Sequence, residues 1–314
     1  MAVVKLLRAL ADDARLRIVL VLRERPLAVQ EIMAVVGMGQ SRVSRHLRIL
    51  AEAGVAKSLR DGTRIYYGLA LEQSAVLRSF LTALDFEKAD DLPPEHIGDL
   101  VRLDEKLRDV REQIQEHFSL SGAGKDDYQR GLVDSQLYRQ WMLAVLPAQA
   151  GTVADIGCGT GVLTAQLRGR AEKIIGIDQN QDQLRQARMR CPEADFRLGE
   201  LENLPLPAAT VDCVLAGMVL HHVPAPELAL AEMRRVLRPG GQLILADLRK
   251  HQMEIMRDRF ADYWLGFDEA RLRELLAGQG FVLERSESRR GEGELDLLLV
   301  SARLAGGTER STIK

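Results

Sequence analysis

The stretch "VADIGCGTG", residues 153–161, decides the fold of the larger part of this 314-residue chain. An apolar, strand-like run leads into Gly157, Gly159 and Gly161, and a helical stretch follows. Glycines at such a turn let the backbone approach a ligand, and the free N–H groups at the helix start attract an anion. The G-x-G-x-G spacing differs from the G-x-G-x-x-G of dinucleotide enzymes, which argues against a pyrophosphate ligand.

The sequence after this stretch alternates between strand-like and helical runs. Apolar runs at 173–178, 211–216 and 242–248 are separated by helical stretches, a pattern that predicts βαβ units and a parallel sheet. Two further runs, at 281–288 and 295–304, predict a closing hairpin. The second strand ends in Asp178, 17 residues beyond Gly161, where a carboxylate can accept both hydroxyls of a ribose.

The N-terminal region has a different plan. Helical periodicity covers residues 3–24, with a break at "ADDAR", and then 27–37 and 40–54. Two strand-like runs within 55–69 are joined by Asp61-Gly62, a strong hairpin signal. This order predicts a winged helix-turn-helix.

Charge favours DNA binding by this region. Residues 1–70 hold 12 Lys and Arg against 6 Asp and Glu, so the segment is +6 and the rest of the chain −8. On a helical wheel Val43, Leu47 and Leu50 face a core, and polar side chains face away as a helix in a major groove requires. The alternative is a solvated helix face, and for His46 a half-buried structural role. The DNA-contact candidates are Gln40, Ser41, Arg42, Ser44, Arg45, His46, Arg48, Arg60 and Arg64.

The first 90 residues also resemble a known family. "LADDARLRIVLVL", "QSRVSRHLRILAEAGV" and "RDGTRIYYGL" resemble the ArsR/SmtB winged-helix regulators. The resemblance implies a homodimer that reads a palindromic operator and is released by a small effector. No cysteine precedes Cys158, so the paired-cysteine motif of the arsenic and cadmium sensors is missing, and we expect no metal site.

Residues 130–303 resemble class I S-adenosylmethionine-dependent methyltransferases. The matching pieces are "DIGCGTG", "GIDQN", "RLGELENLPLPAATVDCVLAGMVLHHV" and "LRPGGQLILADL", in the order of that family. The resemblance implies an α/β Rossmann-like domain with a seven-stranded, mostly parallel, doubly wound sheet and an antiparallel closing strand. The complete fold class is therefore two domains, an α+β winged helix-turn-helix followed by this α/β domain.

The same resemblance assigns binding roles by position. It implies that Asp155 and Gly157 meet the methionine end of the ligand, Asp178 the ribose, and Gln179 the adenine. Glu200 and Leu201 would contact the adenine amino group and ring, and residues 216–218 would line the pocket. The cofactor-binding candidates are Tyr128, Asp155, Gly157, Gly159, Gly161, Asp178, Gln179, Glu200, Leu201, Ala216, Gly217 and Met218.

A catalytic residue does not follow from the sequence. Methyl transfer from a sulfonium needs mainly alignment, with a base only for some acceptors. His221 and His222 lie where an acceptor would arrive, and Asp247 and Tyr128 are similarly placed, but no catalytic role is assigned to them. Trp264 and Phe267 are interpreted as packing for a lid. Whether the chain is an enzyme stays open.

Other sequence features indicate where the protein is located and how the chain is divided into domains. No apolar run approaches the roughly 18 residues of a membrane span, a signal-peptide plan is missing, and three cysteines give no disulfide framework, so we expect a cytoplasmic protein without a membrane partner. The expected divisions are 1–92 for the DNA-binding and dimerisation domain, 93–126 for a linker helix and loop, 127–304 for the methyltransferase-like domain, and 305–314 for a tail.

Three functional hypotheses follow, in this order. The first is a transcriptional repressor, bound to double-stranded operator DNA, whose methyltransferase-like domain binds S-adenosylhomocysteine or S-adenosylmethionine as effector. The fusion resembles the S-adenosylhomocysteine-responsive repressors of methionine-cycle genes. The second is an active methyltransferase with a winged helix for dimerisation or targeting. The third, a metal-responsive repressor, lacks the expected ligands.

Overall fold

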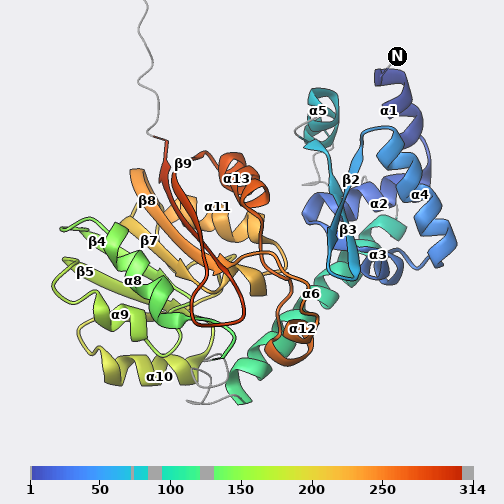
Figure 1. Cartoon of the computed structure of the whole chain (residues 1–314). Coiled ribbons are helices and arrows are strands. Elements are labelled where there is room, and N and C mark those ends of the chain that lie inside the picture. The colour runs from blue at the N-terminus through green and yellow to red at the C-terminus, as the bar shows by residue number, and fades with distance from the viewer. Residues whose placement is uncertain (1, 72–73, 84–93, 121–130, 306–314) are drawn as a thin grey trace, which may run out of the picture. The chain divides into compact units, whose positions relative to one another are not determined.

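The computed structural model describes residues 2–71, 74–83, 94–120 and 131–305 (Figure 1). The chain divides into two compact units, Met1–Glu112 and Gln113–Lys314. No helix in the described part of the chain is both long and apolar enough to cross a membrane. Each unit is described by itself.

The first unit is a small helical domain with a three-stranded sheet, confirming the predicted helix-turn-helix. The apolar faces of its helices pack with its strands into one core, which includes Ile18, Ile32 and Leu47. The sheet order is β1-β3-β2, with β2 and β3 antiparallel as the predicted wing. The elements are α1 (Ala2–Leu10), α2 (Asp13–Glu24), β1 (Leu27–Ala28), α3 (Val29–Val36), α4 (Gln40–Glu52), β2 (Ala56–Asp61), β3 (Arg64–Leu69), α5 (Ala75–Ala83) and α6 (Pro94–Leu120).

Helix ends in this unit follow local capping. The break at "ADDAR" is an N-cap, because the Asp12 side chain accepts a hydrogen bond from the Arg15 N–H at 3.0 Å. The expected helix over 27–37 begins only at Val29. The Glu31 carboxylate accepts the Ala28 N–H at 2.7 Å, and Leu27 and Ala28 pair with β3 instead. A short third strand therefore replaces the first turn of the predicted helix.

The second unit contains a seven-stranded sheet of order β6-β5-β4-β7-β8-β10-β9. β10 runs antiparallel to both β8 and β9, and the pairs among β4 to β8 are parallel. This confirms the mostly parallel Rossmann-like sheet with an antiparallel closing strand. The strands are β4 (Thr152–Ile156), β5 (Lys173–Asp178), β6 (Asp195–Leu198), β7 (Val211–Gly217), β8 (Leu237–Leu248), β9 (Phe281–Arg289) and β10 (Leu297–Leu304).

Helices cover both faces of this sheet (Figure 1). α8 packs on β7, β8 and β10, α9 and α10 pack on β5, and α11 and α13 pack on each other and on β8 and β9 respectively. The central parallel strands β4, β5 and β7 are largely buried, as expected for parallel strands covered on both faces. The helices are α8 (Ser135–Val145), α9 (Val162–Gln166), α10 (Gln181–Arg190), η4 (Leu220–His222), α11 (Pro226–Val236), α12 (Ile255–Phe260) and α13 (Glu269–Gly278).

Candidate functional site

The glycine loop lies where the strand order of the sheet reverses. From β4 the chain continues to β5 and β6 on one side, whereas β7 and β8 lie on the other. The loop of residues 157–161 follows β4, and the stretch Gly217–Met218 ends β7 beside it, because β4 and β7 are parallel neighbours. Ligands of open α/β sheets bind at such a switch point, outside the carboxyl ends of the strands.

Two of the loop glycines are required by close packing. Gly157 has a φ of +70°, and a Cβ there would lie 2.2 Å from Val219 Cγ1. Gly161 has a φ of +76°, and its Cβ would lie 2.9 Å from the Cβ of Ala187 on α10. A side chain at either position would therefore be strained and would push the loop away from its neighbours.

Asp155 is buried at the end of β4, and Thr164 holds its orientation. The Thr164 hydroxyl donates to Asp155 Oδ2 at 2.6 Å, a contact that sequence reasoning missed. Burial raises the pKa of the Asp155 carboxyl to about 6, against the lowering effect of the Thr164 hydrogen bond and with a further rise from the nearby charge of Asp178. A carboxylate in this position is suited to pair with a cationic group of a ligand.

We predict that Asp155 makes the second unit less stable as the pH rises from about 4 to about 6. The folded protein keeps the Asp155 proton up to a pKa of about 6, whereas the unfolded chain releases it near 3.8, so the folded state binds more protons in this window. The free energy of unfolding should fall by about 3 kcal/mol over this range, and the fall should be complete above the pKa of the folded protein.

Asp155→Asn should remove this contribution, and the exposed Asp182→Asn should keep the wild-type pH profile. Urea unfolding between pH 4 and 7, followed by tryptophan fluorescence, measures the stability of the second unit, because both tryptophans, Trp141 and Trp264, lie in it. An Asp155→Asn profile as steep as that of the wild type contradicts the prediction.

Asp178 at the end of β5 is fixed by backbone donors. Gly159 N donates to Asp178 Oδ2 and Asn180 N donates to Oδ1, each at 2.8 Å. Each carboxylate oxygen keeps acceptor capacity beyond these bonds, as recognition of a ribose diol needs. Gln179 is half-buried next to it, and the Asn180 side chain caps α10.

The remaining pocket candidates lie on neighbouring loops. The backbone of Glu200 pairs with that of Asn203 in an isolated antiparallel β-bridge, and Leu201 is buried. Ala216 is buried in β7, and Met218 has a left-handed φ of +58°. Tyr128 falls outside the described residues.

Tyr138 on α8 was missed by sequence reasoning. An added Cβ at Gly217 would meet its ring at 3.1 Å. The sequence around Tyr138 predicts only a helix, because nothing in the spacing of α8 indicates which of its side chains faces β7.

The DNA-contact candidates lie mostly on one exposed face of α4. Val43, Leu47 and Leu50 are fully buried, which confirms the predicted wheel. Ser44 is half-buried, and His46 has a side chain only 12% exposed, 3.9 Å from Asp12. Burial lowers the pKa of His46. The exposed candidates are Gln40, Ser41, Arg42, Arg45, Arg48, Arg60 and Arg64.

The histidines after β7 lie beside buried acids. His221 Nδ1 lies 2.8 Å from Asp247 Oδ1, and both side chains are 1% exposed or less. Trp264 and Phe267 are buried, Trp264 donating its Nε1–H to Val223 O at 2.9 Å, so they are packing residues.

Comparison with known families agrees with both units. A methyltransferase domain model matches residues 154–245, and a model of the bacterial regulatory proteins of the arsR family matches residues 12–58.

Individual relatives match parts of the chain. An uncharacterized 37.1 kDa protein in transposon Tn4556 of Streptomyces fradiae is 41% identical over 117 residues, 35% of this chain and 34% of that protein. A malonyl-[acyl-carrier protein] O-methyltransferase of Serratia marcescens is 33% identical over 104 residues, 33% of this chain and 41% of the relative. The chain thus spans well under half the length of these relatives.

A solved structure supports the fold. A chain of the complex between the Haloferax volcanii Trm112 methyltransferase activator and a methyltransferase superposes with a TM-score of 0.51 at 20% identity, covering 61% of this chain and 98% of that one. The chain therefore holds a segment that matches the arsR-family helix-turn-helix model and, after it, a Rossmann-like domain that matches the methyltransferase model.

Proposed function

We propose that the protein is a DNA-binding transcriptional repressor whose methyltransferase domain binds an adenosyl ligand as effector. The observation that carries the proposal is one chain holding both a helix-turn-helix with an arginine-bearing exposed face and a glycine loop at a sheet switch point. S-adenosylhomocysteine is the leading effector, and S-adenosylmethionine is the alternative. Operator DNA would be met in the cytoplasm, the compartment expected from the sequence.

The DNA-binding half is supported by exposure and charge. Arg45 and Arg48 project from α4 opposite its buried face, and Arg42 is exposed at the side, where guanidinium groups reach phosphates and guanine edges. Arg60 and Arg64 flank the turn of the wing, where they would contact the backbone of the duplex.

The ligand-binding half is supported by fixed polar groups. Asp155 and Gly157 would receive the amino and carboxylate end of the ligand, and Asp178 would accept its ribose hydroxyls. Gln179, Glu200 and Leu201 are proposed to surround the adenine, and Gly159, Gly161 and residues 216–218 to shape the pocket. The domain type and the fold favour an S-adenosyl compound over other nucleosides.

A buried ion cluster supports coupling between α6 and the helix-turn-helix. Asp99 on α6 is 1% exposed, and it accepts hydrogen bonds from Arg17 at 2.7 Å and from Arg102 at 2.5 Å. Arg17 and Arg102 also donate to the carbonyl oxygens of Val36 and Val35 at the end of α3. The start of α6 is thereby fixed to α2 and α3, and the boundary between the two units falls within the same helix.

We also propose a homodimer. α1 exposes three apolar side chains, Val3, Val4 and Leu7, which are 47–53% exposed and suit a second copy of the chain. A symmetric dimer would present two copies of α4 to a palindromic operator.

Methyl transfer is the second candidate function. The favouring observation is the match to the Serratia marcescens O-methyltransferase, together with an intact glycine loop. An enzyme would convert S-adenosylmethionine to S-adenosylhomocysteine with candidate acceptors, whereas a sensor alone would leave the cofactor intact.

Fluorescence anisotropy on the promoter fragment of the gene tests the proposal. We expect one adenosyl compound to change DNA affinity at least tenfold, a coupling of about 1.4 kcal/mol. Adenosine serves as the control ligand. Equal DNA affinity with and without either compound would reject the effector role.

A further inference from the structure

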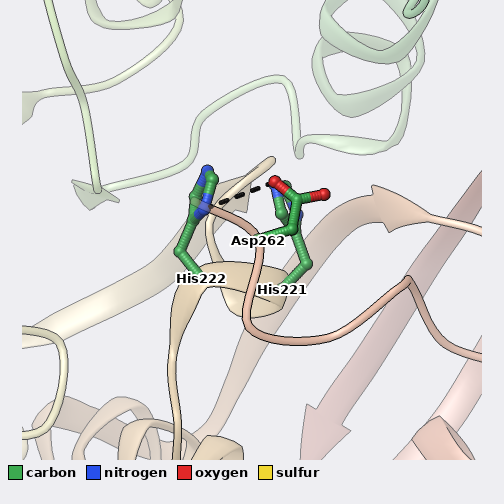
Figure 2. A group of neighbouring side chains, drawn as sticks. All are labelled: His221, His222 and Asp262. Carbon is green, nitrogen blue, oxygen red and sulfur yellow. Dashed lines mark ion pairs between the residues drawn. The ribbon is translucent and has the colours of Figure 1, made fainter. Parts of the chain in front are cut away.

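A compact group of ligand-type side chains lies after β7, and it consists of His221, His222 and Asp262 (Figure 2). The two histidines belong to η4, and Asp262 follows α12, 40 residues later in the chain. One nitrogen from each histidine and one carboxylate oxygen all lie within 4.8 Å of one another. The side chains are 1%, 11% and 1% exposed respectively.

The spacing inside the group matches ligands around a cation better than direct hydrogen bonds. His221 Nε2 and His222 Nδ1 each lie 3.7 Å from Asp262 Oδ1, beyond the range of an N–H···O bond. Nitrogen and oxygen ligands about 2.0–2.1 Å from a tetrahedral zinc ion are about 3.3 Å apart. Each of the two nitrogen-to-oxygen distances exceeds that separation by about 0.4 Å.

Asp247 orients His221 for this role. Its Oδ1 lies 2.8 Å from His221 Nδ1, so Nδ1–H donates to the carboxylate and the lone pair of Nε2 faces Asp262. Asp247 also accepts N–H groups of Leu220 and Leu248, at 2.9 and 2.7 Å, and is itself fixed. A carboxylate that holds the far nitrogen of a ligating histidine is a recurrent feature of metal centres.

The backbone holds the two halves of the group together. The N–H groups of Tyr263 and Trp264 both donate to His221 O at 2.9 Å, which ties the segment after Asp262 to η4. The ligand atoms are thus positioned by main-chain contacts before any ion arrives, which lowers the cost of assembling a site.

Charge favours a cation in this place. Two buried acidic side chains, Asp247 and Asp262, lie next to the two imidazoles. A divalent cation bound to the two histidines and Asp262 would bring positive charge next to both carboxyl groups.

We propose that His221 Nε2, His222 Nδ1 and an Asp262 carboxylate oxygen form a site for a divalent transition metal, with zinc as the preferred ion. In the metal-free protein His222 Nδ1–H donates to Ala261 O at 3.2 Å. To bind the ion, the neutral His222 imidazole takes the tautomer with its proton on Nε2, so that the lone pair of Nδ1 is available to the metal and the bond to Ala261 O is given up. The fourth ligand position is left to water or to a heteroatom of a small ligand, as in zinc sites with three protein ligands.

The site lies beside the glycine loop without belonging to it. Val219, two residues before His221, is the side chain that a Cβ at Gly157 would strike. A bound ion would fasten η4 to the segment after α12 and so hold one wall of the pocket. The inference does not depend on the proposed regulatory function.

Zinc titration of the full-length, chelator-treated protein tests the site, with a chromogenic chelator in competition. We expect one Zn²⁺ per chain. Asp262→Asn and His222→Gln should each weaken binding by at least 100-fold, and Asp247→Asn by 10–100-fold. Excess zinc should raise the Tm of the wild type by about 5 °C and leave that of Asp262→Asn unchanged.

The matched control is His251→Ala, which removes an imidazole outside the group and should keep wild-type affinity. Co²⁺ gives an independent signature, since a low-symmetry nitrogen and oxygen site colours it and Asp262→Asn should lose that absorption. Circular dichroism and the metal-free Tm show that each variant is folded. Absence of a 1:1 complex, or equal affinity of Asp262→Asn and the wild type, would overturn the site.

Discussion

Gly157→Ala is expected to weaken binding of S-adenosylhomocysteine by at least about 100-fold, or about 2.7 kcal/mol. The added Cβ meets Val219 Cγ1 at 2.2 Å, a separation that real Cβ atoms do not show, and the left-handed φ of +70° adds strain. Relief of the collision and of the backbone strain together requires a shift of Val219 and of the loop, and a shift of the loop displaces the N–H groups proposed to hold the ligand. Isothermal titration calorimetry measures the loss.

Gly169→Ala is the control that separates collision from backbone strain. Gly169 has a similar φ of +71°, but nothing lies within 4 Å of a Cβ built there. It should lower the Tm slightly and keep ligand affinity within about threefold of the wild type, about 0.6 kcal/mol. Equal affinities of the Gly157→Ala and Gly169→Ala variants would show that the loop does not form the binding site.

The Arg45→Ala/Arg48→Ala double variant is expected to bind DNA about 100-fold less tightly than the wild type. Each guanidinium that reaches a phosphate or a guanine edge contributes about 1–3 kcal/mol, and neither side chain is needed for the buried face of α4. Loss of two phosphate contacts per half-site should also flatten the salt dependence. Anisotropy at several salt concentrations measures both effects.

A charge-matched variant in the other unit provides the control. Arg185→Ala/Arg273→Ala removes two exposed guanidinium groups, 69% and 57% exposed, from α10 and α13. If DNA binding depended on net charge alone, this variant would lose as much affinity as the α4 variant. We expect it to lose less than twofold, with unchanged binding of the adenosyl ligand.

Much of the fold could be predicted because its signals are local. The capping aspartate at Asp12, the Asp61-Gly62 turn and the buried apolar strands each carry their own pattern. β6, Asp195–Leu198, has no such pattern, because it consists of only four residues of mixed polarity at the edge of the sheet. Only the family resemblance implied this strand. β1 was missed because its pairing partner, β3, is distant in sequence.

The candidate site was predictable only where chemistry and spacing coincide. Asp178 follows a buried strand at a fixed distance from the glycine loop, so sequence alone singled it out. Thr164 and Asp262 were not singled out. Thr164 is an ordinary helix residue until folding sets its hydroxyl against Asp155, and Asp262 meets His221 only through the packing of a loop after α12.

The buried ion cluster of Asp99, Arg17 and Arg102 limits how the helices of the first unit can move relative to one another. Because Asp99 joins guanidinium groups from α2 and α6 that also hold the end of α3, these three helices cannot slide past one another without exposing or unpairing a buried charge. A displacement of α6 would therefore carry α2 and α3 with it, and we expect α4, which packs on both of these helices, to follow. Amide hydrogen exchange should then report equal protection of α3 and α4 in both ligand states, while the distance between the two copies of α4 in the proposed dimer changes.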